Sequence, residues 1–331
     1  MKRSTEPGAM GFFRAALNWH GLTGRGGFAL SVLPVAGLMA AQTQVPPLSL
    51  AGAVLALLSA LAILLFWGHA RRRLRAMGWS GAWMWALVVP LLSLLLVLVM
   101  LVRRPHPEAA PGPFSPAGRA LVWALVAVVA SRALWAPFII PTGSMSPTLQ
   151  PGDYVLATRS LAAPRRGDVV VFRHPVNGYD FLKRVIGLPG DTVQMRDGQV
   201  ILNGTPVPQV AAPDWTEPNR ATASGTRPRC VTPVVAGAPC IKRAATETLP
   251  GGPAYTVLEV GPMATDFTAA MTVPAGFAFV LGDNRDNSLD SRIAQSAGGV
   301  GLVPLAAVAG RVRLVLYSQE GREGRVLRMV E

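Results

Sequence analysis

Lys183 is the residue whose chemistry first draws attention in this sequence. The chain has 31 lysines and arginines, and only three of them are lysines: Lys2, Lys183 and Lys242. A lysine amine can lose its proton on burial, whereas an arginine guanidinium keeps its charge. Lys183 lies among apolar residues in DFLKRVIGLPGD, residues 180–191. Pointing inward, it would have a lowered pKa and could serve as a general base. Pointing outward, it would only protect a sheet edge.

A serine that such a base could activate lies in PTGSMSPTLQPGD, residues 141–153. Gly143 permits a tight turn, and Pro147 and Pro151 keep the segment out of a helix. Ser144 is therefore expected to be held exposed, close after an apolar run. Taken alone, the segment is more typical of a loop of small residues beside a membrane.

A third segment, GDNRDNSLDSR at residues 282–292, is dense in Asp, Asn, Ser and Arg. It has two interpretations. It is either a solvated turn or a hydrogen-bonded scaffold, with Ser288 orienting an amine and Asp290 paired with Arg292 beneath a site. Groups of the second kind fix the rotamer of a catalytic side chain.

The elements that must position these residues fall into two regions. Four apolar runs occupy residues 28–42, 48–67, 82–102 and 119–138. The last three have the roughly 20 residues needed to cross a bilayer. The first is shorter and contains Pro34, so spanning, re-entering and lying at the interface all stay open for it. After residue 140 the chain changes to short β-branched strands between turn residues, with a hairpin predicted at Asp197-Gly198.

The net charge of +13 is explained better by a membrane than by nucleic acid. Much of the excess is arginine beside apolar runs, as in loops that face the cytoplasm: Arg71, Arg72, Arg73, Arg75, Arg103 and Arg104. Arg119 places the start of the last run in the cytoplasm and the C-terminal region across the membrane. If residues 82–102 crossed the membrane completely, the arginines at 71–75 would lie outside the cytoplasm, against the usual preference of positive residues. A hairpin broken near Pro90 would remove that conflict.

Cys230 and Cys240 lie within a Pro- and Thr-rich stretch, residues 204–262, that reads as an insertion or β extension. Two thiols without nearby histidines make a poor zinc site. In an oxidising compartment they would form a disulfide, and the alternative is two unpaired loop cysteines.

Together, the order and content of the three polar segments closely resemble the motifs of bacterial type I signal peptidases, over about 135–192 and 274–320. The resemblance implies a Ser–Lys serine endopeptidase with Ser144 as nucleophile and Lys183 as general base. Ser288 would position the lysine. The Ser144 N–H and the Thr142 hydroxyl would form the oxyanion hole. Thr142 replaces a serine often found there, which keeps the hydroxyl and adds a methyl group.

The resemblance also implies supporting and substrate-binding residues. Those that match the supporting motif are Gly282, Asp283, Asn287, Asp290 and Arg292. Ile140, Met145 and Leu182 would shape shallow pockets for small side chains, which predicts cleavage after Ala-x-Ala sequences. The cysteine pair lies where some family members carry a disulfide. Neither a metal nor a cofactor is implied.

The implied architecture is an N-terminal α-helical transmembrane region followed by a mostly-β catalytic domain with a smaller β extension. We predict a multi-pass membrane region with a Pro-rich linker at 1–117, an anchor at 118–140 and a periplasmic catalytic domain at 141–331. The expected location is the bacterial inner membrane. The expected partners are preprotein signal peptides, membrane lipid and the protein-export machinery, and not nucleic acid.

The N-terminal part has a resemblance of its own. The pieces GLTGRGGF, residues 21–28, and GHARRRLRAMGWSGAW, residues 68–83, resemble a family of small, uncharacterised bacterial inner-membrane proteins. That resemblance implies no chemistry.

Three other functions are weighed against the general signal peptidase. A Ser-His-Asp hydrolase would need His174, the only histidine after residue 140, and no G-x-S-x-G elbow surrounds Ser144. A non-enzymatic membrane adaptor would use the β domain to bind another envelope protein. A specialised processing peptidase would share the chemistry but act on few substrates.

Overall fold

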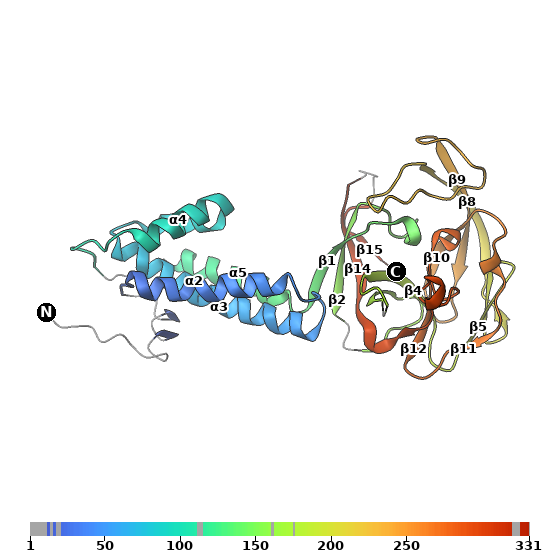
Figure 1. Cartoon of the computed structure of the whole chain (residues 1–331), viewed down its shortest axis with the longest axis horizontal. Helices are drawn as coiled ribbons and strands as arrows, with labels where there is room; N and C mark the ends of the chain where they lie inside the picture. The colour runs from blue at the N-terminus through green and yellow to red at the C-terminus, as the bar shows by residue number, and fades with distance from the viewer. Residues whose placement is uncertain are drawn as a thin grey trace. The chain divides into compact units, whose positions relative to one another are not determined.

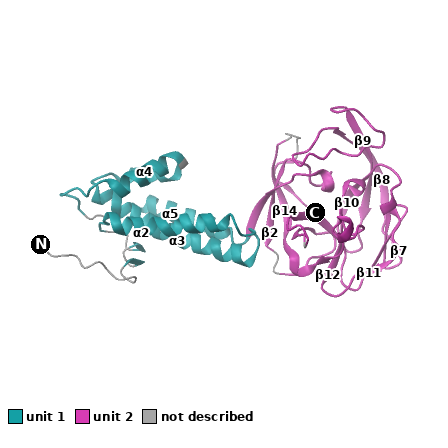
Figure 2. Ribbon diagram, viewed as in Figure 1, with its two compact units in different colours: residues 1–134 teal, residues 135–331 magenta. Residues whose placement is uncertain are grey.

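The structure is a computed structural model that describes residues 12–13, 16–17, 21–110, 115–159, 162–174, 176–319 and 325–330. The chain divides into two compact units, one of residues 1–134 and one of residues 135–331 (Figures 1 and 2). The regular secondary structure described in the first unit is entirely helical, and the second is built mainly from strands.

The helical unit is organised around one long helix. Its elements are α2 (Arg25–Gln42), α3 (Leu50–Ala76), the 3-10 helix η1 (Gly81–Val88), α4 (Pro90–Val102) and α5 (Pro116–Ser131). Apolar side chains from all five elements form a common core that includes Phe28, Trp67, Met84, Met100 and Val122. Among the described helices, α3 alone combines 18 or more residues with the composition needed to cross a membrane.

The apolar run 82–102 is broken, as the alternative with a hairpin near Pro90 predicts. Val89 is extended between η1 and α4, because a proline following it disfavours helical geometry. The end of α4 returns to the end of α3: Arg73 Nε donates to the Met100 carbonyl at 2.7 Å, and the His106 amide donates to the Ala76 carbonyl at 2.6 Å. The run therefore does not form one continuous helix of about 20 residues.

The last apolar run is also divided. We expect one continuous segment over 119–138, but α5 ends at Ser131 and the chain becomes β1 (Trp135–Ile139). Pro137 cannot continue a helix, and all five residues of β1 pair in antiparallel register with β2 (Asp153–Arg159). Backbone pairing in the sheet overrides the apolar composition of these residues.

The β unit contains one large sheet in which the strands follow the order β1-β2-β14-β3-β4-β12-β13, with β15 paired to β14. The remaining bounds in this sheet are β3 (Val169–Arg173), β4 (Asp180–Gly187), β12 (Phe277–Leu281), β13 (Val303–Pro304), β14 (Val308–Ser318) and β15 (Arg328–Met329). The segment that carries Ser144, residues 141–153, follows β1. The segment that carries Lys183, residues 180–191, begins with β4.

Two smaller sheets complete this unit. One contains β5 (Thr192–Arg196), β6 (Gln199–Leu202), β7 (Thr205–Pro206) and β11 (Met271–Thr272). Asp197 and Gly198 both have positive φ, 49° and 76°, between β5 and β6, which confirms the predicted hairpin. The other contains β8 (Gln209–Pro218), β9 (Pro239–Thr248) and β10 (Ala254–Glu259). The stretch 204–262 is thus a paired β extension.

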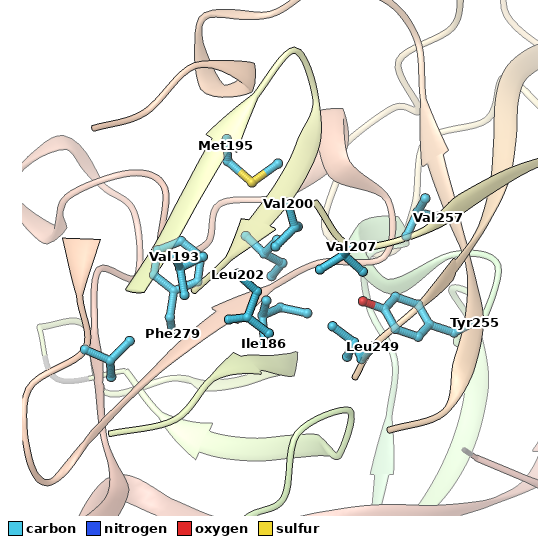
Figure 3. Close-up of a cluster of buried hydrophobic side chains, with 12 residues drawn as sticks. Ile186, Val193, Met195, Val200, Leu202, Val207, Leu249, Tyr255, Val257 and Phe279 are labelled. Carbon is cyan, nitrogen blue, oxygen red and sulfur yellow. The ribbon is translucent and has the colours of Figure 1, made fainter. Parts of the chain in front are cut away.

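The core beneath these sheets joins the extension to the main sheet. Ile186 and Phe279 from the large sheet pack with Val200 from the β5–β6 hairpin and with Leu249 and Tyr255 from the extension (Figure 3). Each of these five side chains is buried. Because close-packed interiors transmit small displacements, this core fixes the extension against the strands that carry the site.

Candidate active site

The structure brings Ser144 and Lys183 into direct contact. Ser144 lies in the 3-10 turn η2 (Gly143–Met145), and Lys183 lies on β4 opposite Val170 of β3. Lys183 Nζ donates a hydrogen bond to Ser144 Oγ at 3.0 Å and another to the Leu182 carbonyl at 3.1 Å. The lysine side chain points inward and is only 3 % exposed. A hydroxyl and a desolvated amine at this distance are suited to proton transfer.

Burial lowers the pKa of the Lys183 amine from 10.5 to about 8. Asp290 and Asp283 act in the opposite direction and raise this pKa, while Arg292 lowers it. Each carboxylate already has its own guanidinium: Arg184 Nε donates to Asp283 Oδ1 at 2.8 Å, and Arg292 Nε donates to Asp290 Oδ1 at 2.9 Å. These pairs limit how strongly the carboxylates can hold the ammonium form.

The loop that carries Ser144 is held by the 282–292 segment. Asn284 donates its side-chain amide to the Gly143 carbonyl at 2.8 Å and its backbone amide to the Ser144 carbonyl at 3.2 Å. Gly282 permits this close approach, since a Cβ there would lie 2.5 Å from the Ser144 carbonyl oxygen and 2.3 Å from Ser288 Oγ. A larger residue at 282 would push the two loops apart.

The same segment is tied to the main sheet and to the extension by buried ion pairs. Asp283 accepts from both ends of the Arg184 fork and from Thr148 Oγ1 at 2.5 Å. Arg285 donates to Glu247 of β9 at 2.6 Å, with both side chains at most 1 % exposed. The segment is therefore a hydrogen-bonded scaffold and not a solvated turn.

Thr142 and Ser288 lie beside the pair in different ways. Thr142 Oγ1 is 3.5 Å from Ser144 Oγ, and Thr142 itself is partly exposed. The Ser288 hydroxyl is buried against Gly282 and makes no hydrogen bond to any residue that the structure describes. The predicted role of Ser288 in positioning Lys183 remains a prediction.

The remaining predicted residues surround the same two loops. Ile140 and Met145 are buried, and Leu182 is half-buried next to Lys183. Asn287 lines a pocket of 50 Å³ together with Gly143, Gln150 and Pro151. The other lining residues belong to the extension: Glu217, Pro218, Arg220, Ala221, Thr222 and Pro228.

Cys230 and Cys240 form a disulfide with a Cα–Cα distance of 5.2 Å. The bridge fastens the loop that follows β8 to the start of β9. In that loop Ser224 Oγ donates to the Pro141 carbonyl at 3.4 Å, so the loop reaches the segment that carries Ser144.

His174 has a structural environment. Its Nδ1 accepts from the backbone amides of Val176 and Asn177, so Nε2 carries the proton and donates to the Gly299 carbonyl at 3.1 Å. Its ring packs against Phe181, and its hydrogen-bond partners do not include Ser144. This arrangement does not favour a Ser-His-Asp hydrolase.

Sequence reasoning missed several residues that hold the site, among them Thr148, Arg184, Asn284 and Arg325. Arg184 and Asn284 stand beside residues singled out by the motifs, so their positions were a usable signal. Arg325 had none. It lies far along the chain, yet it donates to the Pro147 and Thr148 carbonyls, both at 3.1 Å, and pairs with Asp153.

Residues 117–317 match the family described as signal peptidase, peptidase S26. The chain belongs to this family. It is a serine peptidase with the mostly-β domain of the S26 type, which confirms the predicted family, enzyme class and fold class. Signal peptidase I of Bacillus licheniformis is 32 % identical over 203 residues, covering 60 % of this chain and 86 % of the relative.

Other relatives show similar coverage. Signal peptidase I of Rickettsia typhi is 30 % identical over 224 residues, or 58 % of this chain and 76 % of the relative. The crystal structure of a signal peptidase I from Enterococcus faecalis has 31 % identity, covers 46 % of this chain and 98 % of that one, and gives a TM-score of 0.24.

Proposed function

We propose that this signal peptidase cleaves preproteins with Ser144 as the nucleophile and Lys183 as the general base. Cleavage of signal peptides by a serine protease follows from the family. The observation that carries the residue assignment is the 3.0 Å hydrogen bond between Ser144 Oγ and the buried Lys183 Nζ.

In the proposed mechanism, neutral Lys183 takes the Ser144 proton as Oγ attacks the scissile carbonyl carbon. The negative charge that develops on the carbonyl oxygen is stabilised by the Ser144 N–H and the Thr142 hydroxyl, at about 3 kcal/mol per donor. Lys183 then passes its proton to the leaving amide nitrogen, the C–N bond breaks, and the mature chain departs. Finally, Lys183 deprotonates a water that attacks the acyl-enzyme ester, and Ser144 recovers its proton.

The proposed substrate preference rests on the apolar residues next to the pair. Ile140, Met145 and Leu182 would line shallow pockets on either side of Ser144, with room for small side chains. That supports cleavage after Ala-x-Ala sequences at the end of a signal peptide.

We further propose a multi-pass inner-membrane topology in which α2, α3 and α5 cross the membrane and η1 with α4 re-enters. Because α4 returns to the end of α3, the arginines near 71–75 and at 103–104 lie on one side, together with Arg119 at the start of α5. Positive residues favour the cytoplasm. The chain after α5, which includes residues 135–331, would then lie in the periplasm.

The decisive experiment is cleavage of a model preprotein with an Ala-x-Ala site by the full chain in detergent. Wild type and His174→Ala should cleave at that site, whereas Ser144→Ala and Lys183→Ala should lose at least a thousandfold in rate with unchanged circular dichroism. Activity that survives either dyad substitution would refute the assignment. If the wild-type protein processes only one of many preproteins, the result would support a specialised peptidase. If it processes none of them, the result would support an adaptor.

A further inference from the structure

The helical unit has far more positive charge than its own residues can balance. Residues 1–134 contain 12 lysines and arginines but only two carboxylates, Glu6 and Glu108. The rest of the chain is nearly balanced, with 19 cations and 16 carboxylates. In the range 21–134 the only carboxylate is the exposed Glu108, for nine arginines. Most of the counter-charge must therefore come from outside the unit.

Several of these arginines gather at one end of the unit. Arg73 donates to the carbonyls of Met100 and Arg103, Arg72 donates to the Leu22 carbonyl at 2.8 Å, and Arg25 donates to the Val102 carbonyl at 3.4 Å. The bonds join the start of α2, the end of α3 and the end of α4. Each of these bonds ends on a carbonyl oxygen, which carries no formal charge.

A pocket of 210 Å³ opens at this end. Trp67 and Arg71 of α3 line one side. The other lining residues come from η1 and from the start of α5: Gly81, Ala82, Met84, Trp85, Ser115, Ala117, Gly118 and Leu121. A Cβ at position 81 would lie 2.8 Å from Arg71 Cζ, so a larger residue there would displace the guanidinium. The guanidinium lies directly against the Gly81 backbone, and its neighbours in the lining are mostly apolar.

We propose that this pocket binds the phosphate of an anionic phospholipid headgroup, with Arg71 as its principal cationic partner. A guanidinium matches phosphate oxygens in a two-bond geometry, and basic pockets between membrane helices bind anionic headgroups. Trp67 and Trp85 provide the amphipathic rings that favour the headgroup level of a bilayer. This phosphate site would be independent of the Ser144–Lys183 assignment.

The test compares lipid binding by the full chain in detergent with native mass spectrometry and thermal unfolding. Phosphatidylglycerol should bind to the wild type and raise its melting temperature. The control variant is Arg104→Gln, which removes one positive charge from an exposed position outside the pocket, and it should bind the lipid as the wild type does. Arg71→Gln should bind at least tenfold more weakly. Gly81→Val keeps every charge but displaces the guanidinium, and it should be weakened similarly.

The outcomes separate the possible sources of phosphate. Weak binding of phosphatidylcholine and of glycerol 3-phosphate would support an anionic lipid, and glycerol 3-phosphate binding as tightly as the lipid would reassign the pocket to soluble phosphate esters. If Arg71→Gln and Arg104→Gln lost the same amount of affinity for phosphatidylglycerol, the proposal would be overturned, because binding would then follow the overall charge of the protein. Unchanged binding in Gly81→Val would overturn it as well.

An independent observation concerns Arg325, which lies beyond the residues that match the family. Its side chain is buried, with Nη1 donating to the Pro147 carbonyl, Nη2 donating to the Thr148 carbonyl, and an ion pair to Asp153. Asp153 also accepts from the Gln150 amide at 2.8 Å. One guanidinium therefore fastens both ends of the loop that follows Ser144.

We infer that Arg325 is a positioning residue for Ser144. The Leu149 amide donates to the Met145 carbonyl at 2.8 Å, so displacement of the 147–153 loop would be transmitted to the turn that holds the serine. The tail is kept in place by β15, which pairs with β14. Misplacement of a nucleophile by a fraction of an ångström lowers the rate of the chemical step more than it weakens substrate binding.

Arg325→Ala should lower kcat at least tenfold with KM changed less than threefold, and added guanidinium should restore part of kcat. Arg325→Lys, which keeps the charge but has a point-like ammonium, should recover only part of the loss. Arg328→Ala, an exposed neighbour on β15, is the control and should match wild type. An equal loss of kcat in the control, or a change confined to KM, would refute the inference. The melting temperature of each variant reports on folding.

Discussion

Replacing Lys183 with methionine removes the buried amine while keeping a side chain of similar length. Burial lowers the pKa of this amine from 10.5 to about 8. At about 1.36 kcal/mol per pKa unit, a shift of that size costs the folded state roughly 3 kcal/mol whenever the amine is protonated in both states. The hydrogen bonds to Ser144 and Leu182 offset about 1–2 kcal/mol of that cost. Lys183→Met should therefore stabilise the fold by about 1–2 kcal/mol at pH 7.

The sign of the pH dependence follows from the same shift. Below pH 8 the lysine is protonated in the folded and unfolded states, so the full cost is present. Between pH 8 and 10.5 the unfolded state holds more protons, so the stability of the wild type rises with pH. The advantage of Lys183→Met should therefore be largest at pH 7 and should shrink through this window.

Thermal unfolding of both proteins in one detergent, at pH 7 and pH 10, measures the effect. A gain of this size corresponds to a melting temperature roughly 3–6 °C higher for the variant at pH 7. Lys183→Ala is the control, because it removes the amine but leaves a cavity that methionine would fill. Its melting temperature should therefore rise less than that of Lys183→Met. A Lys183→Met protein that is less stable than wild type at pH 7, with the same pH dependence, would show that the amine is not desolvated.

Three further predictions concern the site. The value of kcat/KM should rise about tenfold between pH 7 and pH 9, as the neutral fraction of Lys183 increases around a pKa of about 8, in a pH–rate profile. Gly282→Ala should lower kcat at least a hundredfold in the cleavage assay, because its Cβ would lie 2.3 Å from Ser288 Oγ. Asp283→Leu leaves the Arg184 guanidinium buried without its carboxylate, and should lower the free energy of unfolding by about 3–5 kcal/mol in denaturant titration. Adding Arg184→Leu to it should recover much of that loss.

The sequence alone was sufficient for the family and for the residues proposed to act. The turn that carries Ser144, the apolar strand that carries Lys183 and the polar segment 282–292 each allow a second interpretation when taken alone. Their order and content together resemble the motifs of type I signal peptidases, and that resemblance implies the roles of Ser144 and Lys183. Turns, strands and apolar runs can be predicted locally, because they depend mainly on neighbouring residues. The hairpin at Asp197-Gly198 was predictable for the same reason.

Tertiary structure decided what local patterns leave open. Strand alternation allowed Lys183 to point either way, and only the packing of β4 against its neighbours turned the amine inward. The sequence allowed residues 82–102 either to cross the membrane completely or to form a hairpin broken near Pro90. The hydrogen bond from Arg73 to the end of α4 accompanies the broken form. Arg325 gave no sequence signal, because its function depends on a loop more than 170 residues earlier in the chain. Contacts between residues far apart in sequence arise only when the whole chain packs, and these contacts decide which charges are buried, which are paired and which residues reach the site.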